Sequence, residues 1–93
     1  MVKAATDTQV LSKLLFNAQH RIAVAQVFLA TDEVLVHDDV SSRSGVGRSV
    51  VHKELAILVR IGALRRMEVS RQVFYERADS PFWAFISDLA DRA

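Results

Sequence analysis

Four side chains that can donate hydrogen bonds share one face of the helix expected over residues 48–61. Their spacing of i, i+1, i+4 and i+5 groups them on a helix surface: Arg48, Ser49, His52 and Lys53. Guanidinium and ammonium groups donate to the O6 and N7 atoms of guanine, while hydroxyl and imidazole groups can reach bases or phosphates. This face is therefore a candidate nucleic-acid contact, although a solvated helix surface has the same composition.

Charge is unevenly distributed along the chain. The whole sequence has a net charge of +1, but residues 43–77 contain eight arginine and lysine residues against three glutamates. Residues 79–93, by contrast, contain three aspartates against one arginine. A near-neutral protein with one basic third is typical of a polyanion-binding face, and an arginine-rich solvated surface is the alternative.

Length and composition exclude several classes of protein. The 93 residues, of which 51% are hydrophobic and 25% charged, fit a single globular domain over residues 1–93. The absence of cysteine excludes disulfides, thiolate catalysis and cysteine-ligated zinc. No apolar run is long enough to cross a bilayer, and the first residues lack the apolar core of a signal peptide. We therefore expect a cytoplasmic protein that does not bind a membrane.

The segment "HDD" at residues 37–39 contains residue types that bind metals. One histidine beside two aspartates is a poor ligand set, and Asp38 and Asp39 have another role at the start of a helix. Elsewhere, no spacing of serine, histidine and aspartate indicates a nucleophile activated by a base. We expect no metal, no cofactor and no enzymatic activity.

The spacing of apolar residues predicts five helices, at residues 7–17, 19–30, 39–44, 48–61 and 81–92. Asp38 is the expected N-cap of the third helix and Ser80 that of the last. Residues 34–37 are short and β-branched enough to form a small strand. Two further strands, at 64–69 and 72–77, predict a β-hairpin that turns near Ser70 and Arg71.

All three glycines flank the helix expected over residues 48–61. Gly45 ends the preceding helix where a left-handed residue is usual, and Gly62 lets the chain reverse into the hairpin. Gly47 stands at the helix start, where a residue without a side chain can cap the helix and let a backbone approach closely. The order of elements predicts a mainly α fold with a small β-hairpin wing, a winged helix-turn-helix flanked by N- and C-terminal helices.

The segment "GVGRSVVHKELAILVRIGAL" resembles the recognition-helix segment of winged-helix repressors of the ArsR and MarR type. The matching positions are Gly45, Val46, Val51, Leu55, Leu58, Gly62 and Leu64, and the following "RRMEVSRQVFYER" is similar to the wing of these proteins. Two positions depart from the pattern: Gly47 replaces the usual capping serine and Ser41 the usual alanine. The paired cysteines of ArsR metal sensors are absent, so metal sensing of that kind is not implied.

The resemblance implies that the face with Arg48, Ser49, His52 and Lys53 enters the major groove of double-stranded DNA. Arg43 and Ser44, at the end of the preceding helix, are then placed for phosphates, which position a protein without specifying sequence. Arg71 and Gln72 at the wing tip are expected at the minor groove or backbone. Arg65, Arg66 and Arg77 are either phosphate contacts or charges on a strand face.

The terminal helices carry more apolar surface than one small core needs. We expect them to pair in a homodimer, and the alternative is that they only cover the core. The expected interface residues are Val10, Leu11, Leu14, Leu15, Phe82, Trp83, Phe85, Ile86 and Leu89.

These observations favour a sequence-specific DNA-binding transcriptional regulator, acting as a homodimeric repressor that occludes a promoter. The alternative is a winged-helix module for protein–protein interaction in a larger assembly. Such a module usually lacks basic residues on its recognition face, and Arg48 and Lys53 therefore favour DNA.

Overall fold

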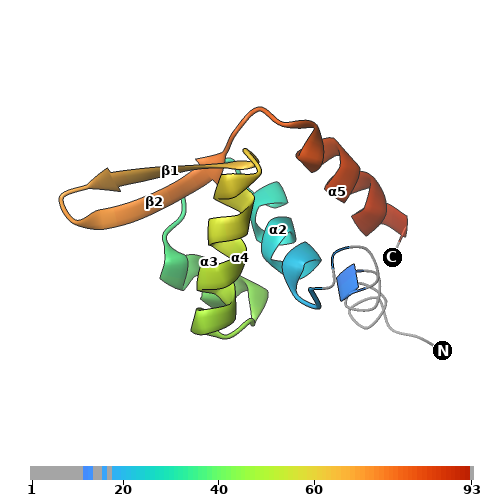
Figure 1. The fold of residues 1–93 in the computed structure, drawn as a ribbon, viewed down its shortest axis with the longest axis horizontal. Helices are drawn as coiled ribbons and strands as arrows, with labels where there is room; N and C mark the ends of the chain where they lie inside the picture. Colours follow the sequence, from blue (N-terminus) through green and yellow to red (C-terminus); the bar gives the residue numbers. More distant parts are fainter. Residues whose placement is uncertain (1–11, 14–15, 17, 93) are drawn as a thin grey trace.

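The computed structural model describes residues 12–13, 16 and 18–92 (Figure 1). Ser12, Lys13 and Phe16 are helical, within the expected first helix. The remaining apolar positions of that helix lie outside the described residues, among them four expected interface residues: Val10, Leu11, Leu14 and Leu15.

Three helices form the helix-turn-helix and its support. They are α2 (Arg21–Leu29), α3 (His37–Ser44) and α4 (Arg48–Arg60). Buried residues lie on most sides of α2, which packs against both α3 and the last helix. Figure 1 shows α3 and α4 beside each other, to the left of α2, joined by a short turn. The helix-turn-helix expected from the sequence is confirmed.

The turn between α3 and α4 is held by short-range hydrogen bonds. Gly45 has a φ of 72°, the left-handed conformation that favours glycine after a helix. The Ser41 hydroxyl donates to the Val46 carbonyl at 2.7 Å, and the Val46 N–H donates to the Ser44 hydroxyl at 3.1 Å. Ser41, which departs from the usual alanine, therefore gives the turn a bond that alanine lacks.

The start of α3 differs from the sequence expectation in two ways. The helix begins at His37 with Val36 as its N-cap, so Asp38 lies in the first turn and is not the cap. The expected strand at 34–37 is reduced to one bridging residue, Leu35, whose N–H and carbonyl pair with Tyr75 at 2.8 and 2.7 Å. Leu35 is buried, and the chain turns into the helix directly after it because Val36 supplies the extended backbone of an N-cap.

The wing is a two-stranded antiparallel sheet of β1 (Leu64–Val69) and β2 (Gln72–Arg77), as expected. Val69 pairs with Gln72, which leaves Ser70 and Arg71 as a two-residue connection with φ of 51° and 69°. Positive φ at both central residues is the mark of a type I′ turn, which matches the twist of the strands. In Figure 1 the hairpin projects from the body of the molecule.

The last helix, α5 (Pro81–Arg92), lies at the opposite end of the molecule from the wing tip (Figure 1). The Phe82 N–H donates to the Ser80 hydroxyl at 3.2 Å, which confirms Ser80 as its cap. Trp83 packs on Phe28 with ring centroids 6.3 Å apart, and its indole N–H donates to the Ala63 carbonyl at 2.8 Å.

Burial within the chain corrects part of the expected dimer interface. Trp83 is 7% exposed and Ile86 0%, so neither offers surface to a second copy. Phe82 and Leu89 are half-buried against the same core, whereas Phe85 is 47% exposed. The face of α5 that carries Trp83 and Ile86 thus completes the core, and the face with Phe85 remains on the surface.

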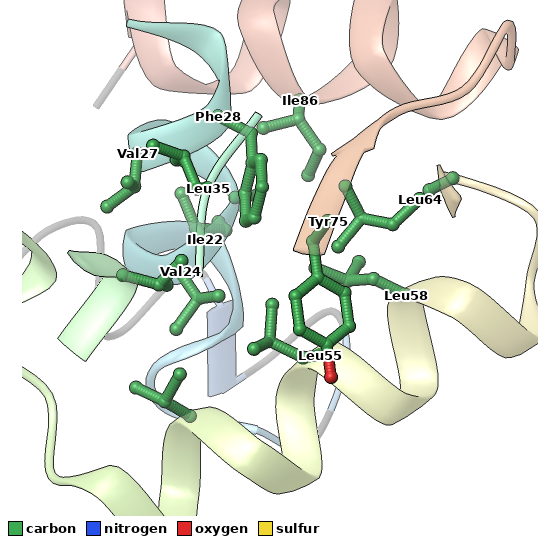
Figure 2. Packing of buried hydrophobic residues seen from close by; sticks show 14 of the residues in the cluster. Ile22, Val24, Val27, Phe28, Leu35, Leu55, Leu58, Leu64, Tyr75 and Ile86 are labelled. Atoms are coloured by element: carbon green, nitrogen blue, oxygen red, sulfur yellow. The ribbon is translucent and has the colours of Figure 1, made fainter. Parts of the chain in front are cut away.

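One apolar core joins all these elements, as Figure 2 shows in close-up. Ile22 and Phe28 of α2 meet Leu55 and Leu58 of α4, and all four are at most 1% exposed. Leu64 and Tyr75 extend the core to the base of the wing. α4 and the wing are therefore fixed to a common body.

Candidate nucleic-acid interface

The expected recognition face is on the surface of α4. Arg48, Ser49, His52 and Lys53 are all exposed. The opposite stripe of the helix is fully buried, with Val51, Leu55 and Leu58 at 0% exposure. The structure thus brings together the four side chains that the helical spacing grouped.

The first turn of α3 contacts the first turn of α4. The Nε2 atom of His37 lies 2.8 Å from the carbonyl oxygen of Arg48. Because a carbonyl only accepts, Nε2 carries the hydrogen in this bond. The His37 ring also meets the His52 ring edge-on, with centroids 5.9 Å apart and planes at 79°. His37, which the sequence placed outside the recognition face, therefore fixes the beginning of α4.

The Arg48 guanidinium is paired within the chain. Its Nη2 atom lies 3.0 Å from Oδ1 of Asp38, and the two side chains are 70% and 66% exposed. Exposed pairs of this kind contribute about 0–1 kcal/mol. A shallow cleft beside them is lined by residues of α3, α4 and β2, including Gln72 and Val73 of the wing. The start of α4 and the turn end of β2 therefore border one surface.

The two residues at the end of α3 that were expected to contact phosphates both have partners within the chain. Arg43 is exposed and pairs with Glu33 at 3.2 Å. The Ser44 hydroxyl is half-buried and accepts the hydrogen bond of the turn described above. Because the Arg43–Glu33 pair is exposed, a phosphate could replace Glu33 as the partner of Arg43. The Ser44 hydroxyl, by contrast, already accepts a hydrogen bond within the turn.

The wing residues divide into paired and unpaired groups. Arg65 pairs with Glu76 across the hairpin at 3.0 Å, and Arg77 pairs with Asp32 at the body of the protein. Arg66 and Arg71 are exposed and form no ion pair with another described residue, and Gln72 is exposed beside them. The wing thus offers unpaired cations near its middle and tip.

A buried ion pair beneath α4 was not predicted from the sequence. Glu54 of α4 lies 2.6 Å from the Nε atom of Arg21 at the start of α2, with side-chain exposures of 5% and 15%. The Arg21 guanidinium also lies 5.5 Å from the centre of the Phe16 ring. The sequence contained one sign of this buried pair: Glu54 stands next to the apolar stripe of the helix, one residue before Leu55. This pair sets the contact of α4 with α2.

Gly47 is the N-cap of α4, with no side-chain cap and an ordinary φ of −59°. A Cβ atom there would meet nothing within 4 Å. The chain's own packing therefore does not require glycine here. The close approach expected at Gly47 would have to come from a bound partner.

Two further observations concern other site types. Among residues 12–13, 16 and 18–92, no three histidine or acidic side chains are grouped to hold a metal ion. Within the same residues, no helix is both long and apolar enough to cross a membrane.

Comparison with solved structures gives several matches over nearly the whole chain. Reduced HlyU from Vibrio cholerae is 22% identical, over 95% of this chain and 87% of that chain, with a TM-score of 0.64. MepR, a transcription regulator of the Staphylococcus aureus multidrug efflux pump MepA, is 12% identical, over 96% of this chain and 69% of that chain, with a TM-score of 0.67. The transcriptional repressor BigR from Xylella fastidiosa is 16% identical, over 88% and 81% of the two chains, with a TM-score of 0.60.

These structures are winged-helix regulators of the ArsR and MarR type. The chain therefore has the winged helix-turn-helix fold of that class, which confirms the fold expected from the sequence. No protein-family profile matches the chain, and no curated protein matches it either.

Proposed function

We propose that the protein is a sequence-specific, DNA-binding transcriptional regulator that works in the cytoplasm without enzymatic activity. One observation carries the proposal: Arg48, on the exposed basic face of α4, lines one cleft with Gln72 and Val73 from the turn end of a wing that has its own exposed arginines. Donors on a helix surface can read base edges in the major groove, and cations on a hairpin can hold the backbone on either side. The similarity in fold to a transcription regulator and a repressor supports this role.

The assignment of contacts follows from where each side chain lies on α3, α4 and the wing. Arg48, Ser49, His52 and Lys53 are assigned to bases and adjacent phosphates, and Gly47 allows the DNA backbone to approach the start of α4. The remaining contacts are assigned to phosphates and the minor groove: Arg43, Ser44, Arg65, Arg66, Arg71 and Gln72. Ser44 contributes only if its hydroxyl donates to a phosphate while it still accepts the bond from the Val46 N–H.

The protein acts as a homodimer in this proposal, joined through the terminal helices. Phe85 is an exposed aromatic residue on α5, and its ring meets Phe16 edge-on with centroids 6.4 Å apart. Phe82 and Leu89 flank it, and Val10, Leu11, Leu14 and Leu15 belong to the proposed interface by sequence. Since α5 and the wing tip lie at opposite ends of the molecule (Figure 1), two copies can join at α5 and leave both wings free. A repressor so built acts by covering a promoter.

The alternative, a protein-interaction module, has one observation in its favour. Three exposed arginines are paired with carboxylates, Arg43 with Glu33, Arg48 with Asp38 and Arg65 with Glu76. These pairs weaken the positive potential of the surface that DNA would meet. The two candidates differ in how binding should respond to salt.

Salt dependence tests the DNA-binding proposal. Each phosphate neutralised by a cation releases counterions, so the four cations that each protomer of the dimer directs at phosphates should together lower DNA affinity about 10⁴-fold between 50 and 200 mM salt. The measurement is a fluorescence-anisotropy titration with a duplex selected from a random library by the protein itself. Failure to select any duplex, or an affinity that stays constant with salt, would support the protein-interaction alternative.

Replacing Phe85 with glutamate tests the dimer. A charge at the centre of the proposed interface should dissociate the dimer, because an unpaired buried charge costs several kcal/mol. Sedimentation velocity should show a monomer for Phe85→Glu, and operator binding should weaken in parallel. Val69→Glu, an exposed apolar residue on the wing, is the matched control and should leave the dimer intact. A parent protein that sediments as a monomer at tens of micromolar would refute the dimer.

A further inference from the structure

The start of α3 contacts the first two turns of α4. Three interactions meet there: His37 bonds to the Arg48 carbonyl, Asp38 pairs with the Arg48 guanidinium, and His37 packs on His52. The sequence analysis assigned Asp38 to helix capping, and the structure removes that role because Val36 is the N-cap and Asp38 makes no cap bond. Asp38 keeps the favourable place of a carboxylate in the first turn of a helix, and its pairing with Arg48 gives it a second contact to explain.

We propose that Asp38 is a specificity-determining residue, which acts by holding the Arg48 guanidinium in the free protein and yielding it only to a correctly placed base. This inference rests on the proposed DNA-binding function. Asp38 contacts Arg48 and is not proposed to contact a base. It is therefore a positioning residue.

The geometry supports a contact that restrains the Arg48 guanidinium in the free protein and that DNA can replace. The backbone of Arg48 is fixed by the 2.8 Å bond from His37, so the guanidinium starts from a defined point. Its partner carboxylate lies 3.0 Å away, and both side chains are mostly exposed, so the pair is weak enough for DNA to replace. A guanine offers two acceptors to one guanidinium, whereas a phosphate at the same place would also meet the negative charge of Asp38. The carboxylate thus disfavours contact with any passing phosphate more than contact with a guanine.

Neighbouring residues provide matched controls. Asp39 stands next to Asp38 in the same first turn, is exposed and forms no ion pair with another described residue. Asp39→Asn therefore removes the same charge from the same turn without touching Arg48. Arg48→Ala removes the group on which Asp38 is proposed to act.

The experiment measures dissociation constants for two duplexes of about 20 base pairs, one selected by the parent protein from a random library and one scrambled. Asp38→Asn should tighten binding to the scrambled duplex more than to the selected one, lowering the specificity ratio about three- to fivefold. Asp39→Asn should change both affinities by the same factor. In the Arg48→Ala background, Asp38→Asn should also change both by the same factor.

A second readout needs no DNA. Nitrogen-15 relaxation of the Arg48 side chain should show a restrained guanidinium in the parent and in Asp39→Asn, and a mobile one in Asp38→Asn. An unchanged specificity ratio in Asp38→Asn, an equal change in Asp39→Asn, or a guanidinium that is already mobile in the parent would each overturn the inference. A parent protein that prefers no duplex would refute the proposed function itself, and that measurement comes first.

Discussion

Replacing Arg48 and Lys53 together with alanine should remove most of the preference of the protein for its selected duplex. Each good contact between a basic side chain and a base contributes about 1–3 kcal/mol of discrimination, so the pair should lower the specificity ratio about 30- to 10⁴-fold. Both side chains are exposed and neither supports the core. The circular dichroism spectrum and melting temperature should therefore stay close to those of the parent.

Two controls separate base reading from simple loss of charge. Arg60→Ala removes one cation from the last turn of the same helix, where Arg60 is exposed. It should cost little discrimination, because base contacts are assigned to the first turns of α4. Arg71→Ala, at the wing tip, should weaken binding to selected and scrambled duplexes by about the same factor. If the doubly substituted protein keeps the parent specificity ratio, α4 is not the recognition helix.

Replacing Glu54 with alanine should destabilise the protein by about 3–5 kcal/mol, because it leaves the largely buried Arg21 guanidinium without its carboxylate. Among the described residues, Arg21 has two other contacts, the Phe16 carbonyl at 3.5 Å and the Phe16 ring, and neither carries a negative charge to replace that of Glu54. The measurement is the free energy of unfolding from a urea titration followed by circular dichroism.

A paired substitution identifies the cause. Arg21→Met combined with Glu54→Leu removes both charges and keeps apolar volume, so it should recover most of the stability lost by Glu54→Ala. Glu76→Ala breaks the Arg65–Glu76 pair on the wing, where Arg65 is 60% exposed, and should cost less than about 1 kcal/mol. Equal losses for Glu54→Ala and Glu76→Ala would show that the buried pair does not stabilise the contact between α2 and α4.

Much of the architecture was predictable because it depends on local backbone preferences. The strands at 64–69 and 72–77 and the last helix at 81–92 have the predicted bounds, since their turn and cap residues mark where each element stops. Gly45 has the left-handed φ that its place after α3 requires. The exposed face of α4 followed from helical spacing alone, so the candidate base-reading residues were identified from sequence.

The failures concern residues whose role depends on distant parts of the chain. The strand expected at 34–37 is reduced to Leu35. Tyr75, forty residues later, forms backbone hydrogen bonds with that one residue of the expected strand. Asp38 was expected to cap its own helix, and the structure pairs it with Arg48 on the next one. Glu54 is buried because Arg21 reaches it from α2, a contact that no local pattern encodes.

The sequence by itself determined the order of α2 to α5, the place of the hairpin turn and that α5 has an apolar face. Only the tertiary structure decided which apolar residues of α5 enter the core. Trp83 and Ile86 are buried and Phe85 is not, although all three are apolar and within one turn of each other. The physical reason is that periodicity fixes the angles between side chains on a helix but not the rotation of the helix against its neighbours. That rotation is set by the fit of the Trp83 ring on Phe28 and by the acceptor that the Ala63 carbonyl offers to its indole N–H.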